Sequence, residues 1–223
     1  MTDVAVRQRI LTANEAAAAE VRARFRASGT LVANLISSPG SGKTALLEAT
    51  VARLQPRFRL GAIEGDIATE RDAERLRRRG IPAHQILTGG ACHLDARQIR
   101  QALDEGRLPE LDILFIENVG NLICPTAYDL GEDFKVVVLS VTEGEDKPFK
   151  YPGIFSRAEV AVISKIDLLP HVSFRLDEVR AQMAALNAGC RIVLTAATTG
   201  EGMDEWCDLL AARLTAKRRG GFR

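Results

Sequence analysis

The sequence lacks long apolar runs, and it lacks a marked excess of charge of either sign. Its longest apolar stretches, such as residues 136–141, are far too short to span a bilayer. Residues 1–20 contain no apolar segment of signal-peptide length. The 30 basic residues are balanced by 29 acidic ones, so no net field draws the chain to nucleic acid or to a membrane surface. We therefore expect a cytoplasmic protein with neither partner.

Cysteine is also scarce, with four residues in a chain of 223. A cytosolic chain of this size needs no disulfides, so we interpret all four as thiols. Cys190 opens an apolar stretch and Cys207 follows Trp206 on an expected helix, where cysteine usually acts as a small buried hydrophobe. We expect those two to belong to the core. Cys92 and Cys124 stand in different surroundings.

Apolar, strand-like segments alternate with segments of helical periodicity along most of the chain. This alternation predicts an α/β fold with a mostly parallel sheet and helices on both faces. Ligands of such folds bind at the carboxyl ends of the strands. The expected strands lie near 30–37, 58–64, 83–87, 112–117, 134–141, 159–164 and 191–195, and the expected helices at 43–54, 69–79, 95–105, 173–187 and 202–217.

The length favours one well-filled core, so we expect a single domain over residues 30–216. Residues 4–27 are rich in Ala, Glu, Gln and Arg and contain no Gly or Pro, which predicts an amphipathic helix within an N-terminal segment, 1–29, that packs on the domain. The basic residues 217–223 are expected to form a solvated tail.

Residues 37–44, with the sequence SSPGSGKT, lie between an apolar strand and a helix, which is the context of the phosphate-binding loop of P-loop NTPases. Its glycines let backbone N–H groups converge on phosphate oxygens at the start of a helix. Lys43 is expected to reach the β and γ phosphates, and the Thr44 hydroxyl to ligate Mg²⁺. Ser37 stands where the common pattern has glycine. The residues expected to bind nucleotide here are Pro39, Gly40, Ser41, Gly42, Lys43 and Thr44.

Magnesium also needs carboxylates at strand ends beside this loop. Asp66 ends one expected strand and Glu117 ends another, so both are candidate ligands and, with Lys43 and Thr44, candidate catalytic residues. Asp66 is also a candidate for orienting the attacking water. Gly120 follows Glu117 at a spacing that lets its N–H approach the γ-phosphate and move when that group leaves.

The segment Ser164–Asp167 follows a strand, and its Lys-x-Asp looks like the guanine-reading motif of GTPases, in which Asn usually stands where this chain has Ser164. An ionised Asp167 accepts hydrogen bonds from guanine but meets an acceptor on adenine. The apolar stem of Lys165 can cover the base. Thr195, Ala196 and Ala197 follow the last strand, where such GTPases hold guanine O6 with a backbone N–H. We therefore expect GTP rather than ATP.

Cys92 and His93 are adjacent in a glycine-rich loop, and Cys124 lies four residues after Gly120. Thiolate and imidazole together suit nickel, zinc or copper rather than magnesium. On these residues alone, plain buried thiols remain an alternative. If they do bind metal, the short segment shared by Gly120 and Cys124 predicts that loss of the γ-phosphate alters the metal site.

With these motifs in this order, the chain resembles the hydrogenase nickel-incorporation GTPases, the hydrogenase maturation factor B family, from about Leu31 to Trp206. Beyond the phosphate-binding loop, the resemblance rests on EGDIAT at 64–69, CHLD at 92–95, ENVGNLICP at 117–125, VTEGEDKP at 141–148 and KIDLLP at 165–170.

The resemblance implies a homodimeric GTPase that binds nickel or zinc through Cys92, His93 and Cys124. It implies as partners a nickel metallochaperone and the large subunit of the hydrogenase that receives nickel. Some family members carry an N-terminal Cys-rich or His-rich metal site, whereas residues 1–30 here contain neither residue, so we expect no high-affinity nickel storage. No arginine finger is evident in the sequence, so we expect slow hydrolysis driven by the charges of Lys43 and Mg²⁺.

Three other functions remain open from the sequence. The first is a related metallocentre GTPase, of the urease-accessory or cobalamin-chaperone type, with another client. The second is an ATP-dependent small-molecule kinase with structural cysteines, which nucleotide competition would separate. The third is a protein-interaction switch without metal, which a metal titration of reduced protein would separate.

Overall fold

The computed structural model describes residues 3–67 and 70–221, and its centre is a sheet of seven strands in the order β3-β2-β4-β1-β5-β6-β7. Every neighbouring pair is parallel, so the expectation of a mostly parallel α/β sheet is confirmed. The strands are β1 (Leu31–Ser37), β2 (Leu60–Asp66), β3 (Ala83–Leu87), β4 (Ile113–Glu117), β5 (Phe134–Ser140), β6 (Val160–Ser164) and β7 (Arg191–Thr195).

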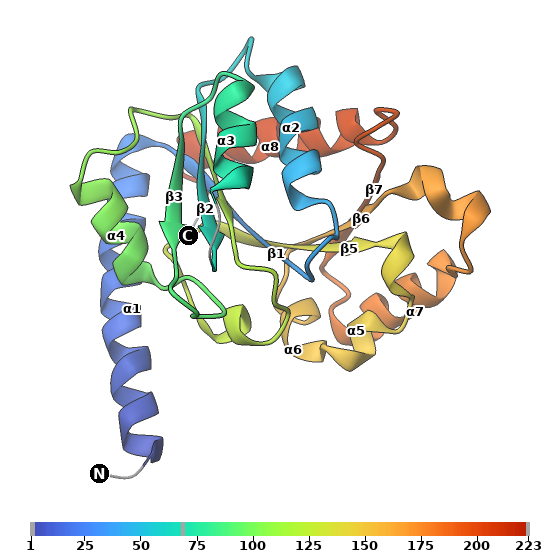
Figure 1. Ribbon diagram of the computed structural model, residues 1–223, viewed down its shortest axis with the longest axis horizontal. Helices are drawn as coiled ribbons and strands as arrows, with labels where there is room; N and C mark the ends of the chain where they lie inside the picture. Colours follow the sequence, from blue (N-terminus) through green and yellow to red (C-terminus); the bar gives the residue numbers. More distant parts are fainter. Residues whose placement is uncertain (1–2, 68–69, 222–223) are drawn as a thin grey trace.

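Helices cover both faces of this sheet (Figure 1). The α-helices are α1 (Asp3–Ser28), α2 (Lys43–Leu54), α3 (Arg71–Arg78), α4 (Ala96–Asp104), α5 (Lys147–Lys150), α6 (Pro152–Phe155), α7 (Leu176–Leu186) and α8 (Met203–Arg218). Three short 3₁₀ turns are η1 (Cys124–Ala127), η2 (Val141–Glu143) and η3 (Ile166–His171). In the described part of the chain, no helix is long and apolar enough to cross a membrane.

The strand pleat divides the core between the two faces. In β1, Leu31, Ala33 and Leu35 pack in the cluster that includes α2, α3 and α8, whereas Val32 and Ile36 face the opposite side. That side is covered by α1 and α4 at one end and by α6 and α7 at the other. The central strands are buried from both sides, as their continuous apolar sequences predict.

The N-terminal helix α1 lies beside α4, and its first turns extend past the body of the protein (Figure 1). Its buried residues are Asn14, Ala17, Ala18, Val21 and Phe25, which share one face at helical spacing. The expected amphipathic helix is therefore present and packs on the domain. Residues 68–69 of the EGDIAT segment, and with them the expected start of the helix after β2, lie outside the described residues.

The expectation that residues from 217 onward form a solvated tail is wrong for the first two. Lys217 and Arg218 belong to the last turn of α8. The Lys217 ammonium is buried and lies 2.6 Å from Asp133 Oδ2, and Arg218 pairs with Asp112 at 2.5 Å. Long basic stems can follow the core to reach carboxylates on other elements, which local charge density does not predict.

Candidate functional site

The carboxyl ends of β1, β2 and β4 open into one cavity of about 470 Å³. The loop between β1 and α2 forms one wall, and the N-terminus of α2 faces the cavity with its partial positive charge. Of the residues expected to bind nucleotide or magnesium, the lining includes Pro39, Gly40, Gly42, Lys43, Thr44, Asp66, Glu117, Gly120 and Lys165 but not Ser41, Asp167, Thr195 or Ala196.

Ser37, which departs from the glycine pattern, has a defined place inside the loop. It is fully buried, and its Oγ lies 2.7 Å from Lys43 Nζ and 2.5 Å from Ser41 Oγ. The Lys43 ammonium donates to this hydroxyl and lies 3.9 Å from Glu117 Oε1. The serine therefore supports the head of Lys43 in the phosphate-binding loop.

Thr44 and Glu117 meet where magnesium is expected. Thr44 Oγ1 donates to Glu117 Oε1 at 3.0 Å, and both side chains are buried. Glu117 Oε2 is buried and has no hydrogen-bond partner among the described residues. Asp66 lies on the same cavity at the end of β2. A hydroxyl and two carboxylates on one cavity are oxygen donors of the kind that Mg²⁺ prefers, so the chemistry of these residues fits the ion.

Glu64 also lines the cavity, and sequence reasoning missed it. It lies opposite Glu117 in the β2–β4 pairing. Burial, and then the charge of Glu117, raises the pKa of the Glu64 carboxyl well above its usual range, whereas Lys43 opposes the shift. Burial also raises the pKa of Glu117. The two carboxyls therefore share a proton more readily than two ordinary glutamates do. The sequence shows only an acidic residue inside an otherwise apolar strand, which does not reveal that Glu117 lies opposite it.

Two further cavity residues from α3 were missed because they read as part of a solvated, charge-rich helix. Asp72 and Arg75 both line the cavity. The Arg75 guanidinium already pairs with Glu48 at 2.7 Å and with Asp72 at 3.1 Å. This arginine is thus held by carboxylates rather than directed at the phosphate loop.

Gly120 lies directly against the phosphate-binding loop. A Cβ on this residue would lie 2.8 Å from Pro39 Cγ, 3.0 Å from its nitrogen and 3.1 Å from its Cα. Real Cβ atoms essentially never approach another atom that closely, so only glycine fits. The segment that runs from Glu117 toward Cys124 is therefore in backbone contact with the loop expected to hold the phosphates.

The Ser164–Asp167 segment is attached to the same loop by two hydrogen bonds. Ser164 Oγ donates to the carbonyl of Ser41 at 2.6 Å, and Lys165 Nζ donates to the carbonyl of Gly40 at 2.7 Å. Lys165 is the one non-glycine residue with positive φ in the described chain, at 60°. That strained conformation places its stem beside Gly42, and such strain commonly marks functional segments.

The guanine-reading region is only partly as expected. Asp167 accepts a hydrogen bond from Thr198 Oγ1 at 2.9 Å, which orients its carboxylate. The N–H of Ala196, however, donates to the carbonyl of Glu201 at 2.9 Å, so it is engaged within its own loop. Thr195 is buried at the end of β7. The N–H of Ala197, the third residue of the expected segment, makes no backbone hydrogen bond among the described residues, so it is the freer candidate for guanine O6.

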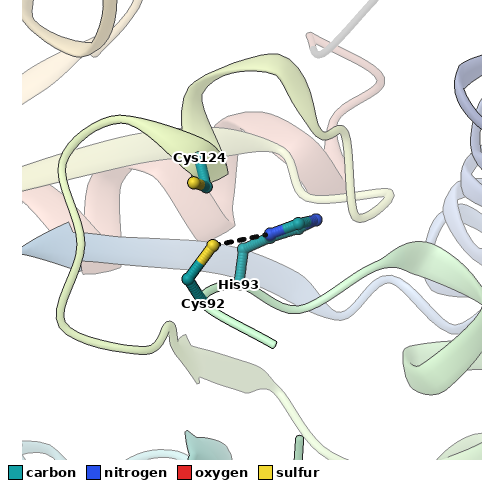
Figure 2. Close-up of side chains that lie close together, drawn as sticks. All are labelled: Cys92, His93 and Cys124. Atoms are coloured by element: carbon teal, nitrogen blue, oxygen red, sulfur yellow. Dashed lines mark hydrogen bonds between the residues drawn. The ribbon is translucent and has the colours of Figure 1, made fainter. Parts of the chain in front are cut away.

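Cys92, His93 and Cys124 form the one group of potential metal ligands in the described chain, with their ligand atoms within 4.8 Å of one another. Figure 2 shows the three side chains converging from two segments, with Cys92 Sγ 3.6 Å from His93 Nδ1. All three are partly buried. Two sulfurs and one imidazole suit zinc or nickel, and the pair of segments that carry them is the one expected from the sequence.

The surroundings of the metal ligands limit their motion. The His93 ring packs against Tyr128, with ring centroids 3.9 Å apart. Asn121 Oδ1 accepts from the N–H groups of Ile123, at 2.7 Å, and Cys124, at 3.3 Å, which fixes the start of η1. Burial lowers the pKa of His93 and so favours the neutral imidazole that binds metals. A hydrogen bond with Cys124, followed by burial, raises the pKa of Cys92.

Asn118 lies between the nucleotide cavity and the group of potential metal ligands, and it was not predicted as a site residue. This buried residue follows Glu117, and its Oδ1 accepts from the N–H groups of Leu94, at 3.2 Å, and Val119, at 3.0 Å. Leu94 comes directly after His93. One amide therefore contacts both the segment beside the phosphate loop and the segment that bears two metal ligands.

The remaining cysteines lie away from this group. Cys207 is buried as expected, whereas Cys190 is only partly buried at the margin of the core. Burial raises the pKa of each thiol to about 11, so both stay protonated at neutral pH.

Comparisons with known proteins agree with this geometry. A family model described as CobW/HypB/UreG, nucleotide-binding domain, matches residues 31–194. Hydrogenase maturation factor HypB of Azotobacter vinelandii is 51% identical over 203 residues, which cover 90% of this chain and 66% of the relative. HypB of Escherichia coli K12 is 49% identical over 93% of this chain and 71% of the relative. The chain thus spans about two thirds of the length of these two relatives.

Solved structures show the same likeness. HypB from Helicobacter pylori in complex with nickel aligns with a TM-score of 0.86 and 41% identity, over 94% of this chain and 97% of that one. HypB from Archaeoglobus fulgidus aligns with a TM-score of 0.85 and 41% identity, over 91% and 99%. A LAO/AO transport system kinase, at 17% identity, 86% of this chain, 62% of that one and a TM-score of 0.61, shares the P-loop NTPase fold alone.

Proposed function

The chain belongs to the CobW/HypB/UreG family and, within it, to the hydrogenase maturation factors HypB, and from this premise we propose that it hydrolyses GTP and carries nickel or zinc for the maturation of nickel–iron hydrogenase. The observation that carries the proposal is spatial. Three potential metal ligands lie within 4.8 Å of one another. The segment of Cys124 contacts the phosphate-binding loop through Gly120, and Asn118 of the same segment accepts a hydrogen bond from Leu94, next to His93.

The nucleotide cavity supports GTP hydrolysis with magnesium. Thr44, Asp66 and Glu117 are the proposed ligands, and bound Mg²⁺ would supply positive charge at the β and γ phosphates. Lys43 adds the chain's own charge at the same place, so positioning and electrostatics provide most of the catalysis. Asp66 is the proposed residue for orienting water. Because Arg75 is paired with Glu48 and Asp72, the described cavity offers no uncommitted arginine and we expect slow turnover.

Guanine selectivity rests on Asp167, with the Ala197 N–H as the proposed donor to O6. The carboxylate matches the N1–H and amino group of guanine, and adenine leaves it unpaired. The hydrogen bonds of Ser164 and Lys165 to the phosphate-binding loop support this assignment because they hold the base-reading segment next to the phosphates.

The metal is proposed as cargo held by Cys92, His93 and Cys124. Three donors leave a tetrahedral or square-planar ion at least one ligand short, and a second copy related by a two-fold axis can supply thiolate from the same surface. We therefore propose a homodimer.

A nickel metallochaperone and the hydrogenase large subunit are the proposed partners, because other members of the family suggest them. A Helicobacter pylori relative, 43% identical, bears the name hydrogenase/urease maturation factor, so urease is a second candidate client.

Metal binding to reduced protein tests the proposal. Wild-type protein should bind nickel or zinc, whereas Cys92→Ala, His93→Ala and Cys124→Ala should each weaken binding without loss of basal GTP hydrolysis. Cys190→Ala and Cys207→Ala are matched controls because those thiols lie outside the cluster. Unchanged metal stoichiometry in the Cys92 and Cys124 variants would refute the metal assignment, and faster turnover of ATP than of GTP would refute the nucleotide assignment.

A further inference from the structure

Asn14, on the N-terminal helix, makes hydrogen bonds to both segments that bear the potential metal ligands. Its Nδ2 donates to the carbonyl of Asp129 at 2.8 Å, and its Oδ1 accepts from the N–H of Ala96 at 2.8 Å. Ala96 follows His93 by three residues, and Asp129 follows Cys124 by five. Asn14 itself is 2% exposed. A single buried amide thus holds the two segments at a fixed separation.

The packing around this amide leaves little room for either segment to shift. Gly131 has a φ of 80°, and a Cβ there would lie 2.9 Å from the carbonyl oxygen of Ala18, so α1 is in backbone contact with the segment after Asp129. Arg22, two turns after Asn14, pairs with Asp129 at 2.5 Å. The segment after η1 is therefore attached to α1 at three points.

Short connections lead from these attachments to the ligands. Tyr128, the neighbour of Asp129, packs on the His93 ring. On the other side, Asp95 caps α4, so the two residues between His93 and Ala96 run directly into a fixed helix start. A displacement at Ala96 or Asp129 is thus transmitted to side chains that Figure 2 shows converging.

We propose that Asn14 is a positioning residue of the metal site, which makes helix α1 part of that site. The inference rests on the proposed metal function and adds to it a residue outside the ligand set. Without the amide, the N–H of Ala96 and the carbonyl of Asp129 lose a buried partner, and the two segments separate or rotate until they find another. Asn14 does not line the nucleotide cavity, so its direct effect is on the metal site.

The test compares Asn14→Ala with wild-type protein by titration of the reduced full chain with nickel and with zinc. Groups that orient metal ligands typically change affinity 10- to 100-fold, so we expect weakening of about tenfold or more. The thiolate-to-nickel charge-transfer absorption should shift or broaden, while GTP turnover stays at the wild-type level. Asn187→Ala is the matched control, because Asn187 also donates to two backbone carbonyls, of Ser156 at 3.2 Å and Ala158 at 2.9 Å, and neither belongs to a segment that bears a potential metal ligand.

A milder variant keeps the test decisive if Asn14→Ala does not fold. Arg22→Ala removes the second attachment at Asp129 and should give a smaller loss of metal affinity. Wild-type affinity and spectrum in folded Asn14→Ala, or an equal loss in Asn187→Ala, would overturn the positioning role alone. Wild-type protein that binds neither metal would instead overturn the proposed metal function itself.

Discussion

Replacement of Gly120 by alanine should weaken nucleotide and metal binding together. The new Cβ would meet Pro39 at 2.8–3.1 Å from three of its atoms, two of them backbone atoms. Because two of these contacts are with backbone, the clash can be relieved only if the Glu117–Cys124 segment or the phosphate-binding loop moves. One movement displaces Cys124 and the other displaces the residues expected to hold phosphate.

Overpacking of this kind typically costs about 1–3 kcal/mol. If the unbound protein shifts to relieve this strain, ligand binding must restore it, and the affinity falls by roughly 5- to 150-fold. Calorimetric titration of a GTP analogue and of nickel should therefore both show losses in that range. Gly189→Ala is the control, since a Cβ there meets only Asn187 Oδ1 at 3.6 Å, an ordinary contact. Wild-type affinity for both ligands in Gly120→Ala would refute the claim that this glycine joins the two sites.

Three further predictions concern the nucleotide cavity. Lys43→Ala should abolish GTP turnover and leave the fold intact by circular dichroism, because the ammonium serves phosphates rather than the core; normal turnover would mean that the loop is misassigned. Asp167→Asn should weaken GTP binding far more than ATP binding in competition assays, and equal losses would indicate a structural carboxylate. Burial and Glu117 raise the pKa of Glu64, so in nucleotide-free protein the contribution of this carboxyl to stability is fully present below the ordinary glutamate pKa and is lost as pH rises through the raised value. Glu64→Gln should reduce that loss in urea unfolding with chelator from pH 5 to 8, and an unchanged slope would argue against a protonated Glu64.

The regular elements followed from the sequence because their patterns are long. All seven strands were expected to within a few residues, and the apolar sequence of the central strands reflects burial from both faces. Short elements such as α5 and η1 were not predicted, because three or four residues are too few for a helical period to appear. The buried pair of Lys217 with Asp133 depends on tertiary distance that local composition does not contain.

The candidate site likewise contains some residues that could be predicted from the sequence and others that could not. Residues that belong to a compact motif, such as Lys43 and the Cys92–His93 pair, could be chosen from the sequence, although their assigned roles stay predictions. Glu64, Asn118 and Asn14 could not, because each acts through a partner from another element: the register of β2 against β4, the N–H of Leu94, and the loops on either side of α1. An isolated polar residue in an apolar strand or on a helix gives little indication of such a partner.

The central claim is that nucleotide and metal binding are linked, and that the proposed dimer takes part in the link. The segment from Glu117 to Cys124 contacts the phosphate-binding loop at one end and carries a potential metal ligand at the other. The most direct test is metal titration with sedimentation of reduced protein, in GDP and in a nonhydrolysable GTP analogue. The account predicts that dimer and metal affinities both differ between the two nucleotides, and that metal changes GTP affinity by the same factor as GTP changes metal affinity. Identical dimer and metal affinities in the two nucleotide states would contradict it.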